Sequence, residues 1–326
     1  MIPSPAGSEH DTPPVRRIGV IGSLVWDRIR HPSRPDSALE QWGGIAYSLA
    51  AISASCPEGW SVVPLLKVGD DLADDARDFL LSLPHLSLDA GFRRVPEPTN
   101  RVELIYTDAD RRGERLTGGV PAWEWAEIEP FLPELDALYL NFISGFEMGL
   151  ETAQRVRAAF PGPIYADLLT LFLGCPGAGI RQRRALPDWE QWVACFDVVQ
   201  LNEDEVAMLG GMRPREELAP RILEIGASIL VETRGEDGVR IEARPGPLSG
   251  EPGLLSARIP LDGPPRSGDP TGCGDVWGGT FFAHLLAGEA IESAAEMANR
   301  CASAKIGVAG TRALQGRLAS VPRSSS

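Results

Sequence analysis

Six short runs rich in β-branched and aliphatic residues recur along the chain, with helical patterns of apolar residues between them. In chain order the runs are RIGVIGS, SVVPLLKVGD, ALYLNFISG, PIYADL, DVVQLNED and SILVETRGE. Strands that alternate with helices form crossover units, and the strands of such units lie parallel in one sheet. The rhythm therefore predicts an α/β fold of three layers, α/β/α, with a mostly parallel central sheet and helices on both faces.

Polar residues stand where these apolar runs stop. They are Ser23, Asp70, Asn141 with Ser144, Asp167, Asn202 and Thr233. Because ligands bind outside the carboxyl ends of the strands in open parallel sheets, one rim is expected to gather most of the chemistry. Taken singly, each of these positions is explained by a turn former or a helix cap, and it is their number that points to a site.

Two stretches interrupt the rhythm, at about 24–42 and 92–118. Both carry extended, alternating and turn-rich sequence with no helix between, which predicts a small antiparallel β lid projecting from the main sheet. Residues 1–14 and 319–326 are polar and rich in Pro or Ser, and are expected to be tails of a single folded domain over 15–318. A lid sheet of this kind also raises the expectation of a homodimer through the lid.

Composition narrows the class of protein. The 326 residues are 43% hydrophobic, as in an ordinary globular protein, so disorder and fibres are excluded. The net charge of −14 opposes binding to nucleic acid or to an anionic membrane surface. Five scattered cysteines lack zinc-site spacing, and no apolar run is long enough for a signal peptide or a membrane span. A cytoplasmic location is expected.

The segment GDPTGCGD at 268–275 is the most informative motif. The apolar stretch from Val276 has the length of a buried helix, so Gly272, Cys273 and Gly274 are expected at its N-terminus, where N–H groups and the helix dipole favour an anion. Asp275 then falls in the first turn, beside the bound anion, where a carboxylate can take a proton from an incoming hydroxyl. Ordinary helix-end electrostatics is the alternative explanation of Asp275.

Two further segments carry candidate ligand groups. Gly43-Gly44 opens a helix and permits close approach of a ligand to backbone, while Asp27 follows the first strand and can hold sugar hydroxyls; a plain turn also explains the glycines. Asn202 and Glu205 follow a strand directly. They cap a helix, or they orient water on a magnesium ion beside nucleotide phosphates, and both roles are compatible.

Taken together, these motifs resemble the ribokinase-like (PfkB) carbohydrate kinase family. The likeness rests on Gly43-Gly44, on the NxxE motif at 202–205, on Thr233-Arg234-Gly235 and above all on DPTGCGD at 269–275, and it spans nearly all of 17–310 in order. It implies a ribokinase-like fold and transfer of the γ-phosphate of ATP, with Mg²⁺, to a hydroxyl of a sugar or related small alcohol.

The resemblance also assigns roles to individual residues. Asp275 matches the catalytic base, and the anion hole matches Thr271, Gly272, Cys273 and Gly274. The substrate-binding positions match Asp27, Gly43, Gly44 and, where the family usually has Asn, Ser48. The nucleotide contacts match Asn202, Thr233 and Gly235, and Glu205 matches the residue that holds Mg²⁺ through water.

Departures from the family pattern keep other functions open. Ser48 is shorter than Asn and has less hydrogen-bonding capacity, which leaves the identity of the substrate undecided. A nucleoside kinase is one alternative. A non-catalytic sugar- or nucleotide-sensing protein that kept the kinase fold is another, although retention of Asp275 argues against it.

Overall fold

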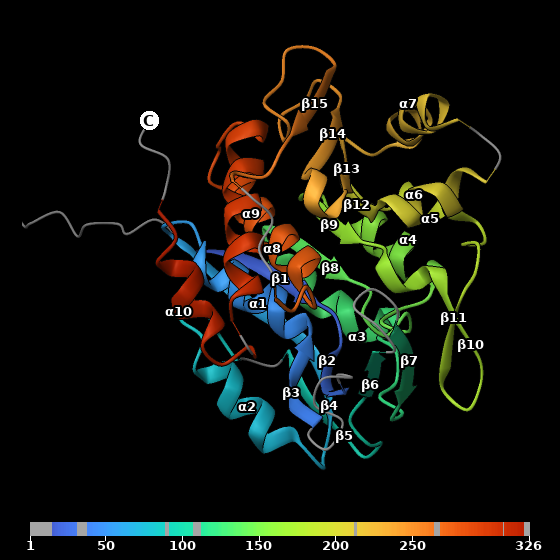
Figure 1. Ribbon diagram of the computed structural model, residues 1–326, viewed down its shortest axis with the longest axis vertical. Coiled ribbons are helices and arrows are strands. Elements are labelled where there is room, and N and C mark those ends of the chain that lie inside the picture. The colour runs from blue at the N-terminus through green and yellow to red at the C-terminus, as the bar shows by residue number, and fades with distance from the viewer. Residues whose placement is uncertain are drawn as a thin grey trace, which may run out of the picture.

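The computed structural model describes residues 15–30, 38–88, 91–106, 112–211, 214–263, 268–308 and 310–322. Within these residues a nine-stranded sheet forms the centre, in the order β15-β14-β13-β12-β9-β8-β1-β4-β5 (Figure 1). Neighbouring strands from β13 to β5 are parallel, whereas β14 and β15 are antiparallel at one edge. The predicted fold class is confirmed.

The six predicted apolar runs form six consecutive neighbours of this sheet. Their strands are β1 (Arg16–Ile21), β4 (Trp60–Gly69), β8 (Ala137–Asn141), β9 (Ile164–Asp167), β12 (Val198–Asn202) and β13 (Ile229–Thr233). Nearly every residue of these strands is buried, which explains the continuous apolar runs, because helices cover both faces. The edge hairpin is β14 (Val239–Ala243) and β15 (Leu255–Ile259).

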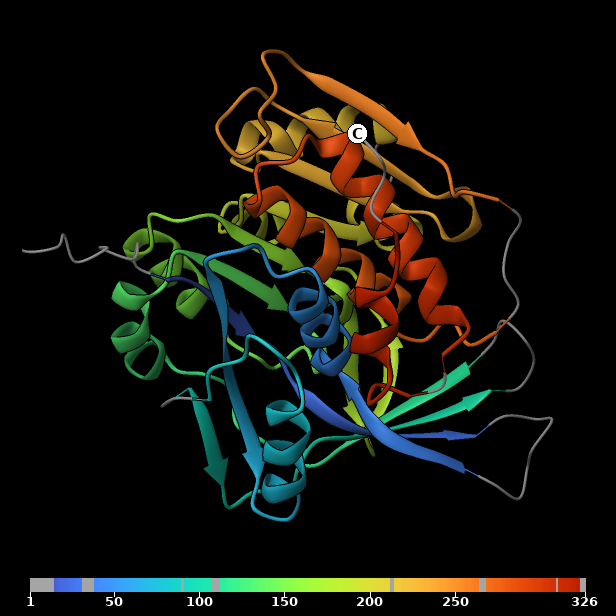
Figure 2. The ribbon, with the colours of Figure 1, turned by 90° about the vertical axis from the view of Figure 1, so that its left-hand side faces the viewer.

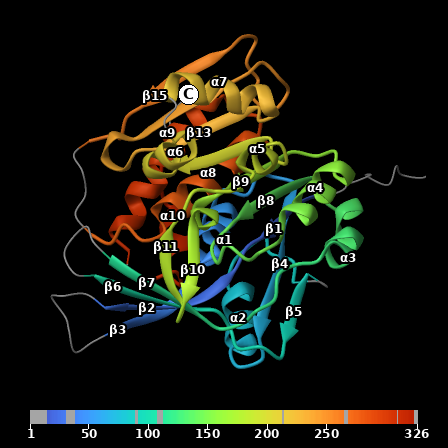
Figure 3. The ribbon, with the colours of Figure 1, turned by 90° about the vertical axis from the view of Figure 1, so that its right-hand side faces the viewer.

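Helices cover the two faces of the sheet as separate layers with separate apolar cores (Figures 1 and 3). One layer contains α1 (Ile45–Ala54), α2 (Ala73–Leu81), α8 (Cys273–Leu286), α9 (Ile291–Ile306) and α10 (Leu314–Ala319). The other contains α3 (Trp125–Ile128), α4 (Leu150–Ala159), α5 (Trp189–Val193), α6 (Glu203–Gly210) and α7 (Arg215–Ile225). Short 3₁₀ turns are η1 (Glu129–Glu134), η2 (Leu169–Phe172) and η3 (Gly235–Asp237). Helix α8 packs against both α1 and α9, beside the site described below.

The second sheet projects from the main one as the expected lid (Figure 2). It has six strands in the order β10-β11-β7-β6-β2-β3, which makes it larger than predicted. The strands are β2 (Leu24–Arg30), β3 (Ala38–Gly44), β6 (Arg101–Tyr106), β7 (Arg112–Thr117), β10 (Leu173–Gly177) and β11 (Ile180–Arg183). All neighbours are antiparallel except β2 and β6, which are parallel, so the lid is mixed.

The boundaries of the lid differ from the prediction at two places. Strand β5 (Phe92–Val95) lies within the predicted lid segment 92–118, yet it pairs parallel to β4 at the edge of the main sheet. The hairpin β10–β11 was not expected in the lid, because its Gly- and Pro-containing sequence is typical of a loop. The expected homodimer through the lid stays a prediction.

The ends of the chain fall partly outside the described residues. The expected tail 1–14 and residues 323–326 of the expected tail 319–326 are among those not described. Helix α10 carries the described fold across the expected boundary at 318. No helix among the described ranges has the length and apolar character needed to cross a membrane.

Candidate active site

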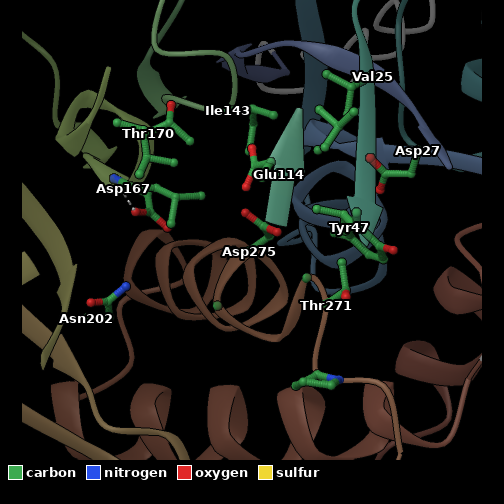
Figure 4. A pocket seen from close by; sticks show the side chains of 18 of the residues that line it. Val25, Asp27, Tyr47, Glu114, Ile143, Asp167, Thr170, Asn202, Thr271 and Asp275 are labelled. Atoms are coloured by element: carbon green, nitrogen blue, oxygen red, sulfur yellow. Dashed lines mark hydrogen bonds between the residues drawn. The ribbon is translucent and has the colours of Figure 1, made fainter. Parts of the chain in front are cut away.

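A pocket of about 460 Å³ opens where the carboxyl ends of the central strands meet the lid and the start of α8. Figure 4 shows Asp275 near its middle, Asp27 and Tyr47 on one side, and Asp167 and Asn202 on the other. The described residues that line it are Val25, Asp27, Gly44, Tyr47, Val102, Leu104, Glu114, Ile143, Asp167, Leu169, Thr170, Leu173, Gln200, Asn202, Glu205, Thr233, Pro270, Thr271, Gly272, Gly274 and Asp275. The rim expected from the strand ends thus gathers Asn202, Asp167 and Thr233 in one place.

The loop before α8 has the form expected of an anion site. The helix begins at Cys273, and Gly272 precedes it with φ +81°, a conformation that favours glycine. A side chain on Gly272 would also strike the ring of Tyr47, 2.5 Å away, so only glycine fits there. Thr271, Gly272 and Gly274 line the pocket, and the two glycines do so through their backbone. Cys273 does not line it, and its N–H donates to the carbonyl of Pro270 at 3.0 Å, which leaves the glycines as the better amide donors.

A buried network of hydrogen bonds holds the Asp275 carboxylate in place. The Nδ2 atom of Asn141 donates to Oδ1 of Asp275 at 2.7 Å and to Oγ of Ser48 at 3.2 Å. The hydroxyl of Tyr139 also donates to Oγ of Ser48, at 3.3 Å. Ser48 is fully buried and is not among the residues that line the pocket. The expectation that Ser48 binds substrate is therefore corrected: because α1 turns it toward β8, it positions Asn141.

Asp27 and the glycine pair form one unit on the lid side of the pocket. Strands β2 and β3 pair so that Val25 lies opposite Gly43, which brings the carboxylate of Asp27 over the Gly43 backbone. A Cβ atom on Gly43 would lie 1.8 Å from Oδ2 of Asp27. Gly44 has φ +59° and precedes α1, and a Cβ atom there would lie 2.6 Å from Ile143. Gly43 thus makes room for Asp27, and Gly44 lets the chain turn from the lid into α1.

Asn202 and Glu205 lie on the opposite side, at the junction of β12 and α6. They form a capping box in which the Glu205 N–H donates to Asn202 Oδ1 at 2.9 Å and the Asn202 N–H donates to Glu205 Oε2 at 2.8 Å. Both side chains nevertheless line the pocket, as does Thr233 at the end of the neighbouring strand. Gly235 does not line it and is exposed in the turn η3, two residues further on.

The electrostatics of the pocket favour a cation between the carboxylates. Burial raises the pKa of Glu205 to about 7. Burial also holds the pKa of Asp167 well above its usual range, and the charges of Glu205 and Asp275 raise it further. None of the described residues that line the pocket is a Lys, Arg or His.

The described residues contain no cluster of three or more metal-ligating side chains. Mg²⁺, however, commonly keeps several waters and needs only one or two carboxylates, so Glu205 and Asp167 fit a hydrated magnesium ion.

Several residues of the site had no local sequence signal. Tyr47 lies in the first turn of the apolar helix α1, Gln200 stands two residues before the end of β12, and Glu114 comes from the lid strand β7. Gln200 joins two parts of the site, because its Nε2 atom donates to Asp167 Oδ2 at 2.7 Å and to the carbonyl of Gly274 at 3.2 Å. The sequence does not single out Gln200, because the polar residues that indicate the site stand where the strands stop, and Gln200 lies within β12.

Comparison with known proteins identifies relatives of the fold. A ribokinase from Thermotoga maritima aligns with a TM-score of 0.70 and 21% identity over 93% of this chain and 98% of its own. A nucleoside kinase from Burkholderia thailandensis, solved with inosine, aligns at 0.71 and 17% over 93% and 96%. A ribokinase from Arabidopsis thaliana, complexed with ribose and ATP, aligns at 0.66 and 16% over 95% and 100%.

A comparison with curated protein sequences gives no significant match. The sequence pattern of the pfkB family carbohydrate kinases matches residues 178–315, which include the NxxE motif and the DPTGCGD loop. Over these residues the chain therefore matches the pfkB family of carbohydrate kinases, and over nearly its whole length it has the ribokinase fold.

Proposed function

We propose that the protein is an ATP-dependent, Mg²⁺-requiring kinase that transfers the γ-phosphate to a hydroxyl of a sugar or related small alcohol. The observation that carries the proposal is the position of Asp275. Its carboxylate stands in the first turn of α8, beside the Gly272 and Gly274 backbone, and in the middle of the pocket between Asp27 and Asn202 (Figure 4).

In this reaction Asp275 takes the proton of the attacking hydroxyl. Asp27, fixed over Gly43, accepts hydrogen bonds from the alcohol and sets its orientation. The backbone N–H groups of Gly272 and Gly274, at the N-terminal end of α8, stabilise negative charge on the transferring phosphoryl group. When bound, Mg²⁺ neutralises phosphate charge, and Glu205 through water, with Asp167, would hold it. Asn202 and Thr233 are proposed at the nucleotide. Gly235 does not line the pocket, and we propose it as a nucleotide contact only because it lies in the turn that follows Thr233.

Release of ADP from ATP, measured over a panel of sugars, polyols and nucleosides, tests this proposal. Transfer to one acceptor that depends on Mg²⁺ and is lost in Asp275→Asn supports it. Pyrophosphate and GTP serve as alternative donors, and a clear preference for either would overturn the ATP assignment. Ligand-induced thermal stabilisation without any phosphoryl transfer would instead favour a sensing protein.

A nucleoside is the second candidate acceptor, and the walls of the pocket favour it. Six of the described residues that line the pocket are aliphatic: Val25, Val102, Leu104, Ile143, Leu169 and Leu173. An apolar wall suits the flat body of a nucleobase better than the hydroxyl-covered surface of a free sugar. A higher kcat/KM for inosine or adenosine than for ribose would select this candidate. A cytoplasmic location stays a prediction from the sequence.

A further inference from the structure

The chain contains 29 arginines and only two lysines, Lys67 and Lys305. Both lysines are enclosed, with side chains 5% and 1% exposed respectively. A lysine ammonium is a compact cation, whereas an arginine guanidinium is a wide planar fork. In a chain that otherwise uses arginine, these two positions are therefore places where a small cation is built into the fold.

Lys305 lies in the last turn of α9, directly beneath the loop that precedes α8. Its Nζ atom donates to the backbone carbonyl of Asp269 at 2.8 Å and lies 3.6 Å from the Asp269 carboxylate. It also lies 5.4 Å from the centre of the Tyr47 ring, whose face attracts cations. Lys305 thus places its charge on the first residue of the DPTGCGD motif.

A short chain of contacts leads from this ammonium into the pocket. The Asp269 carboxylate near Lys305 accepts the Thr271 N–H at 2.9 Å, and Thr271 lines the pocket. The same end of α9 meets the loop twice more. A Cβ atom on Gly268 would lie 2.4 Å from the Ile306 carbonyl, and the Cys273 thiol is 3.6 Å from the Ala302 carbonyl. The loop is therefore seated on α9, and Lys305 is its charged contact.

We propose that Lys305 is a positioning residue for the phosphate-binding loop, a built-in cation that holds Asp269 and Thr271 in the conformation that receives phosphate. The inference rests on the proposed function, because it concerns the same loop. Holding the loop before nucleotide binds removes an ordering cost from the reaction, and the fixed positive charge below it favours phosphate above it.

Lys67 provides a matched control. Its Nζ atom donates to the Ala122 carbonyl at 2.8 Å and to Glu127 Oε2 at 2.6 Å, and it lies 4.8 Å from the centre of the Trp123 ring. This lysine has the same three kinds of partner as Lys305, namely a carbonyl, a carboxylate and an aromatic face. It is not among the residues that line the pocket. The two lysines therefore differ in what they hold rather than in how they are buried.

The first test compares K305M with K67M at a temperature where circular dichroism shows both to be folded. For K305M we expect kcat to fall on the order of 100-fold and the KM for ATP to rise, since small displacements of a reacting geometry have effects of that size. K67M should keep the kinetic constants of the parent. In K305A, ammonium chloride should restore part of the lost rate, whereas tetramethylammonium chloride, too large for the space, should not. Unchanged kcat in K305M, or equal losses in both variants, would overturn the proposal.

The second test does not depend on turnover and needs no substitution of Lys305. In protein labelled with ¹⁵N-lysine, the two side-chain ammonium signals can be assigned with K67M alone. Addition of Mg²⁺ and ADP should shift the Lys305 signal and leave the Lys67 signal in place. If no acceptor is phosphorylated while the Lys305 signal shifts, the proposed function fails and the role of Lys305 at a phosphate site stands. A Lys305 signal that does not respond to bound nucleotide rejects that role.

Discussion

The side-chain amide of Asn141 donates a 2.7 Å hydrogen bond to the carboxylate of Asp275, across 134 residues of sequence. Asn141 ends the strand β8 and Asp275 lies in the first turn of α8, so the contact joins the sheet to the helix that carries the proposed base. The same amide contacts Ser48 on α1. Three elements therefore fix the direction in which Asp275 faces the pocket.

Replacement of the proposed base should remove turnover and leave the fold intact. Asp275→Asn keeps the size of the side chain and can still accept the Asn141 hydrogen bond, but an amide does not take the proton of the acceptor. We expect kcat to fall by about 10²–10⁴-fold or more, with little change in ATP affinity. Single-turnover kinetics and nucleotide titration measure the two quantities. Activity within a few-fold of the parent would show that Asp275 is not the base.

Loss of the Asn141 amide should weaken the base without removing it. The amide fixes the direction in which the Asp275 carboxylate faces the acceptor, and a small misplacement of a reacting group has a large effect on rate, so Asn141→Ala should lower kcat by roughly 10- to 100-fold. Because the amide stabilises the charged carboxylate, its loss should also move the acid limb of the pH–rate profile to higher pH. Ser48→Ala, which leaves the direct contact in place, is the control and should show a smaller change. An unshifted profile in Asn141→Ala would mean that the amide serves packing alone.

Substitution of Gly43 should weaken binding of the acceptor and leave binding of ATP unchanged. In Gly43→Ala the new methyl group would lie 1.8 Å from Oδ2 of Asp27, so the carboxylate must move. We expect the KM for the acceptor to rise strongly while the affinity for ATP, measured without acceptor, stays close to that of the parent. Gly113→Ala, in the lid strand β7, meets open space and is the matched control. Equal loss of ATP affinity would show that Gly43 supports the whole site instead.

The parts of this fold that could be predicted from sequence are those with a local cause. The six buried strands are continuous apolar runs, and the loop at 269–275 carries its glycines and Asp275 side by side. The sequence predicts β5 in the wrong sheet, because nothing in its four residues FRRV indicates that it pairs with β4.

In the candidate site, too, the features that the sequence did not reveal are contacts between segments that lie far apart in the chain. The family resemblance predicts Ser48 at the substrate, because its position in the sequence does not reveal that its side chain contacts Asn141. The contacts of Asn141 with Asp275 and of Lys305 with Asp269 join elements that meet only once the sheet has formed. No local sequence pattern marks such pairs, so they could not be predicted from the sequence.

Stability should depend on pH through Glu205. Burial raises the pKa of this carboxyl from 4.5 to about 7, so the folded protein binds the proton more tightly than the unfolded chain does. Between those two values the contribution of Glu205 to stability therefore falls as the pH rises. Glu205→Gln removes the titration and keeps a side chain that serves in a capping box. In buffer without Mg²⁺, urea unfolding should show the variant gaining stability relative to the parent between pH 5 and pH 8. If the difference in stability between variant and parent does not change with pH, Glu205 is not the group that titrates in this range.

Cys273 should be an inert thiol in spite of its place at the start of α8. Helix N-termini commonly lower the pKa of a cysteine, but here burial raises the pKa of the Cys273 thiol to about 11; Lys305 lowers it only in part, and Asp269 and Asp275 raise it further. The sulfur lies 3.6 Å from the Ala302 carbonyl, on the α9 side of the loop, and Cys273 does not line the pocket.

At pH 8 very little thiolate forms, so iodoacetamide should modify Cys273 far more slowly than it modifies free cysteine. Cys273→Ala should stay active, because alanine fits the same space, and its rate of inactivation by the reagent should equal that of the parent. Rapid inactivation of the parent that ATP slows and Cys273→Ala abolishes would instead place a reactive thiolate in the phosphate-binding loop.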